Sequence, residues 1–202
     1  MHFVAAVFAF AVVFLLARAT PLDSRSVESS KCYTTHTGYF EEGPSPFGLN
    51  SGHHVVYPAT TDAPKFKVHF QRCTQLTRYG KVTPFIYWGR IVAVQGGSVK
   101  ANQCLTSTPS STSGILYAKL ADCGNDSNPP TNQSWSFITD DIGRVILFAG
   151  NCSADDGAGF IVDPNRSGIH PVTTKGTHLM KMACGNDVPG IGVGYFTLSG
   201  LN

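Results

Sequence analysis

Beyond residue 20, the hydrophobic residues of this chain fall into short stretches rather than into long periodic segments. No stretch there keeps apolar residues at positions i, i+3, i+4 and i+7 over three turns, so helices are not expected. The stretches are separated by loops rich in glycine and proline, which are typical turn residues between strands. The pattern therefore predicts an all-β protein.

The amino-terminal end is different, because residues 3–16 form an unbroken run of apolar and small residues. The run is short for a membrane span, and residues 17–19 place small side chains where a signal peptidase cleaves. We predict a signal peptide over residues 1–19, a polar extension over 20–31 and a secreted, extracellular protein. A transmembrane anchor is the alternative interpretation of this run, and no later segment is long and apolar enough to span a membrane.

Six cysteines follow the leader and divide the chain into similar units. Residues 67–73, 117–123 and 178–184 are each a strand-like stretch that ends in a cysteine. The other three cysteines each open a unit. Of the fifteen possible pairings, we expect the one with a disulfide inside each unit: Cys32–Cys73, Cys104–Cys123 and Cys152–Cys184.

An aromatic strand follows the closing cysteine of each unit, at residues 85–88, 135–137 and 195–198. In the first two units a second apolar stretch comes next. Three units with one order predict three-fold internal symmetry, with repeats over about 32–103, 104–151 and 152–202. Each unit has too little apolar surface to fold alone, so we expect the aromatic strands to point into one shared core.

The first unit is longer than the others, and residues 41–64 are rich in Gly, Pro, Ser and Thr. We expect this segment to be an inserted surface loop. Its aromatic residues Phe47 and Tyr57 either form an exposed contact surface or fasten the loop to the rest of the domain.

Composition narrows the choice of cofactor and partner. An even number of cysteines in an exported chain indicates disulfides, and the absence of Cys-x-x-Cys argues against zinc. Lys plus Arg (15) nearly balance Asp plus Glu (13), with no basic stripe, so nucleic acid is not an expected partner. The adjacent His53 and His54 point to opposite sides of an extended segment and do not form a chelating pair. We expect no metal and no cofactor.

Four Asn-x-Ser/Thr sequons fit passage through a secretory pathway and mark surface positions. These candidate N-glycosylation sites are Asn125, Asn132, Asn151 and Asn165.

Three segments of the second unit resemble the ricin B-type lectin family. Residues 102–106 are similar to that family's cysteine strand, and 132–137 to its Gln-x-Trp strand with the preceding Asn. Residues 141–146 resemble the turn and strand that follow. The resemblance covers about residues 32–202 and implies a single β-trefoil of about twelve short strands. It also implies a non-enzymatic, carbohydrate-binding module.

In that family, a sugar site uses an Asp after the opening cysteine, an aromatic ring before the closing cysteine and the Asn before Gln-x-Trp. Carboxylate and amide groups hydrogen-bond sugar hydroxyls, while the ring covers the apolar sugar face. The second unit keeps Asn132 and Gln133 but has Thr106 and Ala121 at the acid and ring positions. Gln133 and Trp135 also have a structural interpretation, in which the Trp fills the core and the Gln ties a turn.

The third unit offers Asp155 or Asp156 as the acid, with Met182 at the ring position. An ordinary solvated turn is the alternative interpretation of this Asp-Asp-Gly segment. The sugar-site pattern is therefore degenerate, and the residues proposed to bind ligand are Asn132, Gln133, Asp155 and Asp156.

No local nucleophile motif is present, so we predict a non-catalytic module that recognises an extracellular glycan or protein. One alternative is a secreted trefoil protease inhibitor that presents residues 41–64, and another is a secreted effector acting through surface loops. A carbohydrate-active enzyme using Glu42 or Asp155 is a third. Glu41 and Glu42 are more simply interpreted as a solvated acidic patch.

Overall fold

The computed structural model describes residues 31–80, 82–140, 143–152, 157–185 and 192–200. The predicted signal peptide and all but one residue of the predicted extension therefore lie outside the described residues. Within them, the chain forms fourteen strands and one 3-10 turn, with no α-helix. No described helix has the length and apolarity needed to cross a membrane.

The strands in chain order are β1 (Tyr33–Glu42), β2 (Ser45–Pro46), β3 (Gly48–Leu49), β4 (Val55–Val56), β5 (Lys67–Arg72), β6 (Ile86–Ala93), β7 (Gln103–Pro109), β8 (Leu116–Asp122), β9 (Trp135–Asp140), β10 (Gly143–Phe148), β11 (Ala158–Ile161), β12 (Lys181–Cys184), β13 (Val193–Gly194) and β14 (Thr197–Ser199). The 3-10 turn η1 (Thr131–Gln133) precedes β9. The expected all-β class is confirmed.

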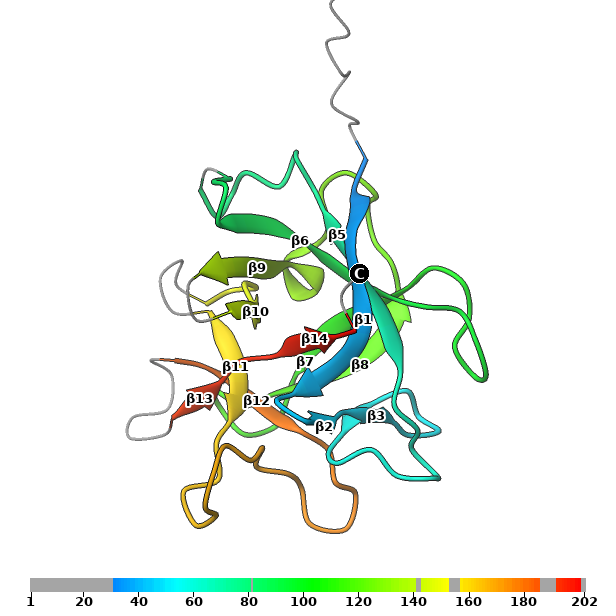
Figure 1. Ribbon diagram of the computed structural model, residues 1–202, viewed down its shortest axis with the longest axis vertical. Helices are drawn as coiled ribbons and strands as arrows, with labels where there is room; N and C mark the ends of the chain where they lie inside the picture. Colours follow the sequence, from blue (N-terminus) through cyan, green and yellow to red (C-terminus); the bar gives the residue numbers. More distant parts are fainter. Residues whose placement is uncertain (1–30, 81, 141–142, 153–156, 186–191, 201–202) are drawn as a thin grey trace, which may run out of the picture.

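Seven strands form a closed circuit of antiparallel pairings, in the order β6, β7, β8, β12, β11, β10, β9 and back to β6. Strand β5 pairs with β6, β1 pairs with β5, and the last strand β14 lies beside β1 (Figure 1). A closed circuit leaves few unpaired strand edges, which are the common route to aggregation in β proteins.

The three disulfides are those expected, and together they account for all six cysteines. Cys32 joins Cys73, Cys104 joins Cys123, and Cys152 joins Cys184. The strand-like stretches predicted before the closing cysteines form β5, β8 and β12.

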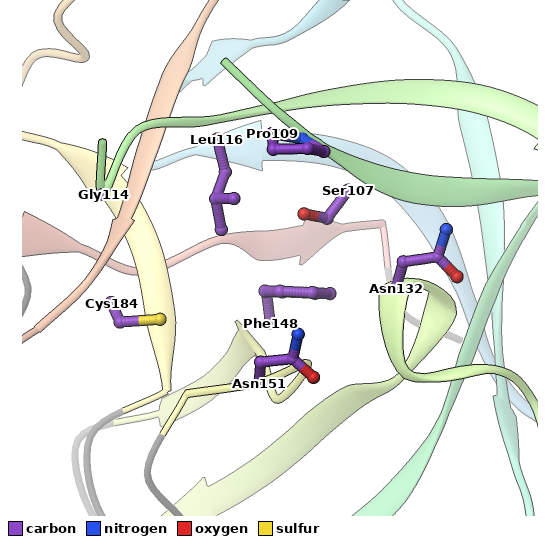
Figure 2. Close-up of a pocket in the computed structure, with 8 residues that line it drawn as sticks. All are labelled: Ser107, Pro109, Gly114, Leu116, Asn132, Phe148, Asn151 and Cys184. Carbon is purple, nitrogen blue, oxygen red and sulfur yellow. The ribbon is translucent and has the colours of Figure 1, made fainter. Parts of the chain in front are cut away.

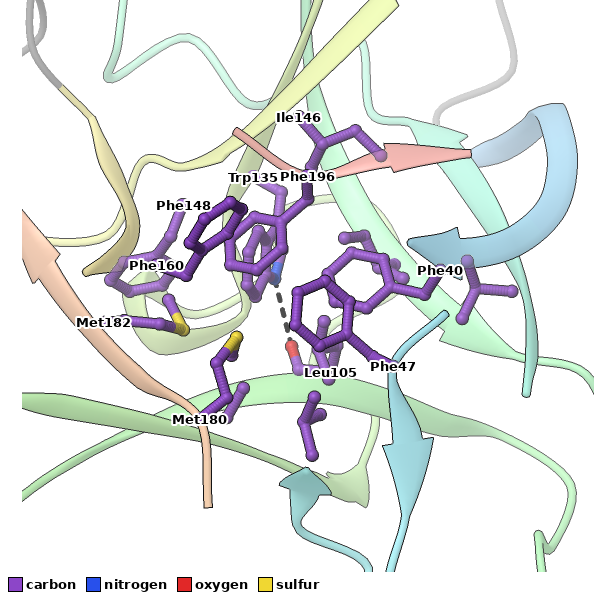
Figure 3. Packing of buried hydrophobic residues seen from close by; sticks show 14 of the residues in the cluster. Phe40, Phe47, Leu105, Trp135, Ile146, Phe148, Phe160, Met180, Met182 and Phe196 are labelled. Atoms are coloured by element: carbon purple, nitrogen blue, oxygen red, sulfur yellow. Dashed lines mark hydrogen bonds between the residues drawn. The ribbon is translucent and has the colours of Figure 1, made fainter. Parts of the chain in front are cut away.

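One aromatic cluster joins the three cysteine units in a common core (Figure 3). The fully buried ring of Phe196 lies 4.8 Å from Phe40, 5.6 Å from Phe47, 6.0 Å from Trp135 and 5.5 Å from Phe160, measured between centroids. These rings come from the first, second and third units. The expectation of a shared core is therefore confirmed. The expectation that the three aromatic strands point into it does not hold for the first unit, because Phe85 is 64 % exposed and Trp88 packs in a separate cluster with Cys73 and Leu76.

The segment 41–64 is not a surface loop, and that expectation is wrong. Phe47 is fully buried and Tyr57 is buried, so both aromatic residues fasten the segment to the core. Strands β3 and β4 pair as a small hairpin, and Val56 makes a bridge to Leu179. The prediction failed because the many Gly, Pro, Ser and Thr residues around these apolar side chains are typical of a surface loop, although the segment is part of the core.

The first and second units also differ in the aromatic strand. In the second unit the two apolar stretches form separate strands, β9 and β10, which pair as a hairpin. In the first unit they form one continuous strand, β6, whose first half pairs with β9 and whose second half pairs with β5. The similarity of residues 85–92 to residues 135–146 in sequence therefore does not extend to the local backbone.

Candidate functional site

Gln133 ties the turn that carries the Asn-Gln-x-Trp segment. Its buried side-chain amide donates hydrogen bonds to the Thr106 hydroxyl (3.0 Å) and the Asp122 carbonyl (2.9 Å). Its side-chain oxygen accepts a bond from the backbone N–H of Gly124 (2.8 Å). A buried polar side chain needs such partners. The three hydrogen bonds therefore agree with the structural interpretation, in which Gln133 ties a turn.

Trp135 lies in the core, as the structural interpretation predicted. Its indole N–H donates a hydrogen bond to the Leu105 carbonyl, at 3.0 Å (Figure 3). Its ring meets Phe148 edge to face, with 5.2 Å between centroids. Trp135 thus supports the ring of Phe148 from the core side.

A pocket of about 300 Å³ lies beside η1 and is lined in part by Phe148, whose side chain is buried. It is lined by Ser107, Pro109, Gly114, Leu116, Asn132, Phe148, Asn151 and Cys184. In Figure 2 the Phe148 ring lies between Ser107 and Asn151, with Asn132 beside it. The lining comes from the second unit and from the closing cysteine of the third.

The pocket combines neutral polar groups with an apolar floor. Asn132 and Asn151 are exposed, and each side-chain amide can both donate and accept hydrogen bonds. Ser107 adds a hydroxyl, while Phe148 and Leu116 add apolar surface. Among the described residues that line the pocket, none carries a charged side chain. This lining suits a neutral ligand that carries several hydroxyl groups.

Two neighbouring features fix the groups in the pocket. Gly150 adopts a left-handed backbone (φ +40°), and a Cβ there would lie 2.0 Å from atoms of the Phe148 ring. Only glycine therefore allows the loop to pass so close to the ring. Asn151 precedes Cys152, whose disulfide to Cys184 borders the same pocket.

Comparisons with protein-family models, with curated proteins and with solved structures found no match to this chain. The resemblance to ricin B-type lectins thus rests on its own residues alone, chiefly 102–106 and 132–137, and stays a prediction.

The structure describes two of the four residues predicted to bind ligand. Asn132 lines the pocket, whereas Gln133 is buried behind it. Asp155 and Asp156 lie outside the described residues. Thr106, at the acid position of the family pattern, is buried; its hydroxyl donates to the Cys104 carbonyl and accepts from Gln133.

Sequence reasoning missed Ser107 and Phe148 and recognised Asn151 only as a sequon. Strand β7 brings Ser107 next to η1, and β10 with the residues after it brings Phe148 and Asn151 there. No local sequence motif indicates that these three residues lie together. The four sequon asparagines, however, are all exposed, so the expected surface positions are confirmed.

Glu41 and Glu42 do not form the solvated acidic patch that the sequence suggested. Neighbours on a strand point to opposite faces, and Glu42 is buried. The Tyr57 hydroxyl donates to its carboxylate (3.4 Å) and also contacts Nδ1 of His170 (3.4 Å). Burial raises the pKa of Glu42, against the lowering effects of His170 and of the Tyr57 hydrogen bond. The two carboxylates therefore do not face one substrate position together.

Among the described side chains, no group of three or more His, Cys, Asp or Glu residues is arranged to hold a metal ion.

Proposed function

We propose that this chain is a secreted, non-catalytic recognition protein with a β-trefoil fold, and that it binds a neutral saccharide in the pocket beside η1. The observation that carries the proposal is the pair of exposed amides, Asn132 and Asn151, that flank the ring of Phe148. The two amides can both donate hydrogen bonds to and accept them from sugar hydroxyls, while the buried Phe148 ring adds only a small apolar surface.

Three features support the trefoil part of the proposal. Each cysteine unit is closed by its own disulfide, the units share one aromatic core, and the strand pairings form a closed circuit. The predicted leader over residues 1–19 and the disulfides support secretion, and the exposed sequons at Asn125 and Asn165 support N-glycosylation. The saccharide proposal requires Asn132 and Asn151 to keep free amides, because a glycan attached to either side chain would occupy the same group.

The pocket supports a small ligand or one end of a larger glycan. Its volume, about 300 Å³, is at the lower end of the range for small-molecule sites, which runs from about 300 to 1,000 Å³. Its openness to solvent on the side of Asn132 and Asn151 lets a glycan chain continue outward. Recognition then depends on the amides and on Phe148 rather than on the family's acid and ring positions.

A glycan array of the mature protein tests this function. The variants Asn132→Ala and Asn151→Ala each remove one pocket amide, and Asn165→Ala is the matched control. All three remove an exposed sequon, so the control accounts for the loss of an attached glycan. We expect the control to bind like the wild type and each pocket variant to bind about tenfold more weakly, the effect of losing one well-formed hydrogen bond.

A further variant, Asn132→Gln, separates the amide from the sequon, because it keeps an amide and loses the glycan attachment site. It is expected to retain more binding than Asn132→Ala. Binding to no glycan at all, or binding that neither pocket variant weakens, would overturn the proposal.

Protease inhibition is the second candidate, because the β3–β4 hairpin is anchored in the core by Phe47 and presents an exposed turn at Ser51 and Gly52. A turn held in this way can keep one conformation in a protease cleft. Assays against serine, cysteine and aspartic proteases distinguish the candidates. Inhibition without glycan binding would replace the saccharide proposal with this one.

A further inference from the structure

Two hollows meet at a cross-strand pair far along the chain from the pocket beside η1. Tyr39 on β1 pairs with Lys67 on β5, and these two residues line both hollows. One hollow, of about 300 Å³, extends towards residues 94–99, and the other, of about 260 Å³, towards residues 199–200. A ligand lying across this pair can contact both sides of it.

Two ammonium groups converge on the ring of Tyr39. Nζ of Lys65 lies 4.2 Å and Nζ of Lys67 lies 5.1 Å from the ring centroid. The negative face of the ring attracts both cations, but the two cations repel one another. The arrangement therefore gathers positive charge at one point of the surface.

Among the described residues, the ion pairs join Lys31 and Arg90 to Asp126, and none within 4.0 Å involves Lys65 or Lys67. Glu41, two residues from Tyr39 on the same strand, is the nearest carboxylate along β1 and makes no such ion pair with a described residue. No described Asp or Glu lines either hollow. An anion placed between the lysines would relieve their repulsion and gain two charge-assisted contacts.

The rest of the lining supplies neutral hydrogen-bonding groups. Thr35 and Thr37 line the smaller hollow, and Gln95 and Ser98 line the larger one. A positive centre surrounded by hydroxyl and amide groups matches a sugar ring that carries an acidic substituent. A long basic stripe, which nucleic acid requires, is absent from a chain of net charge +2.

We propose that Lys65, Lys67 and Tyr39 form a second binding site, for an anionic polysaccharide that carries sulfate or carboxylate groups. Tyr39 positions the two lysines, and the hollows on either side receive the neighbouring sugar residues. This site is independent of the neutral pocket.

The test measures binding of the glycosylated, mature protein to heparin, a sulfated polysaccharide, and to polygalacturonate, a carboxylated one. The double variant Lys65→Gln/Lys67→Gln removes the site's charge. The double variant Arg166→Gln/Lys175→Gln is the matched control, because it changes two exposed basic residues that line neither hollow and gives the same net charge. Thermal melts verify that both variants are folded.

We expect the wild type to bind at least one polyanion, more weakly as salt is added. The site variant is expected to bind about thirtyfold more weakly, the effect of removing two lysines that face an anionic surface, and the control to lose much less. Binding to neither polyanion, or equal losses in both variants, would overturn the proposal. Equally tight binding of a DNA duplex would also overturn it. Binding of neutral glycans should be unchanged in the site variant. The experiments can therefore refute either proposed site without refuting the other.

Discussion

The buried amide of Gln133 donates a hydrogen bond to the hydroxyl of Thr106, 3.0 Å away, and this bond joins η1 to β7. Asn132 directly precedes Gln133, and Ser107 directly follows Thr106. Both of these neighbours line the pocket beside η1. A structural bond between buried residues thus sets the spacing of two groups that can meet a ligand.

Replacing Gln133 with Ala should destabilise the fold by about 1–3 kcal/mol, because buried partners lose their hydrogen bonds. The partners are the Thr106 hydroxyl, the Asp122 carbonyl and the Gly124 N–H. Urea unfolding measures the change, and the exposed Gln75→Ala is the control. An unfolding free energy equal to that of the control would contradict the role given to Gln133.

Gly150→Ala should be more damaging than Gly43→Ala. Both glycines have a left-handed backbone, with φ of +40° and +49°, so both variants carry a similar backbone strain. A Cβ at Gly150 meets the Phe148 ring at 2.0 Å, whereas a Cβ at Gly43 has no atom within 4 Å. Overpacking costs about 1–3 kcal/mol more, measured as the difference in unfolding free energy between the two variants. Equal losses would show that the Phe148 contact is unimportant.

Phe47→Ala tests the place of segment 41–64 in the core. Removing a fully buried Phe costs about 3–5 kcal/mol, and Phe47 has no exposed surface. The control is Phe85→Ala, because Phe85 is 64 % exposed and its loss should change stability little. If chemical denaturation gives similar midpoints for the two variants, the segment is not a core element.

The stability of the protein should fall below neutral pH because of His36. Its ring stacks on Phe137 with 4.1 Å between centroids, and burial, followed by the charge of Arg144, holds the pKa of His36 below its usual 6.5. The unfolded chain therefore takes up the proton first as the pH falls through 6.5, and folding loses free energy from there down to the folded-state pKa.

Unfolding of the wild type and of His36→Gln between pH 7.5 and 5 measures this effect. The stability advantage of the wild type over the variant should shrink as the pH falls. The control is His178→Asn, at an exposed His with φ of 54°, a conformation that Asn tolerates. A wild-type advantage over His36→Gln that stays constant with pH would contradict this origin of the pH dependence.

The cysteine pairing could be read from the sequence because each closing cysteine ends a recognisable strand. Trp135 and Phe137 were likewise predictable core residues, since they belong to an aromatic strand. The burial of segment 41–64 was predicted only as an alternative, because Phe47 stands alone among turn residues and residues 55–57 form only a short apolar run.

The candidate site was predictable only at Asn132, which a local motif marks. Phe148 and Ser107 enter the pocket through the register of β10 and β7 against their neighbours. The position of Phe148 also depends on Gly150, whose role appears only when the ring is placed beside it. Contacts of this kind, between residues distant along the chain, leave no signal in a single sequence.

Peptide mapping of the unreduced protein tests the division into three self-closed units most directly. A lysine or arginine lies between every two consecutive cysteines, so trypsin places each of the six on a different peptide. The account predicts three linked pairs, Cys32 with Cys73, Cys104 with Cys123 and Cys152 with Cys184. A linked pair that joins cysteines of different units would contradict it.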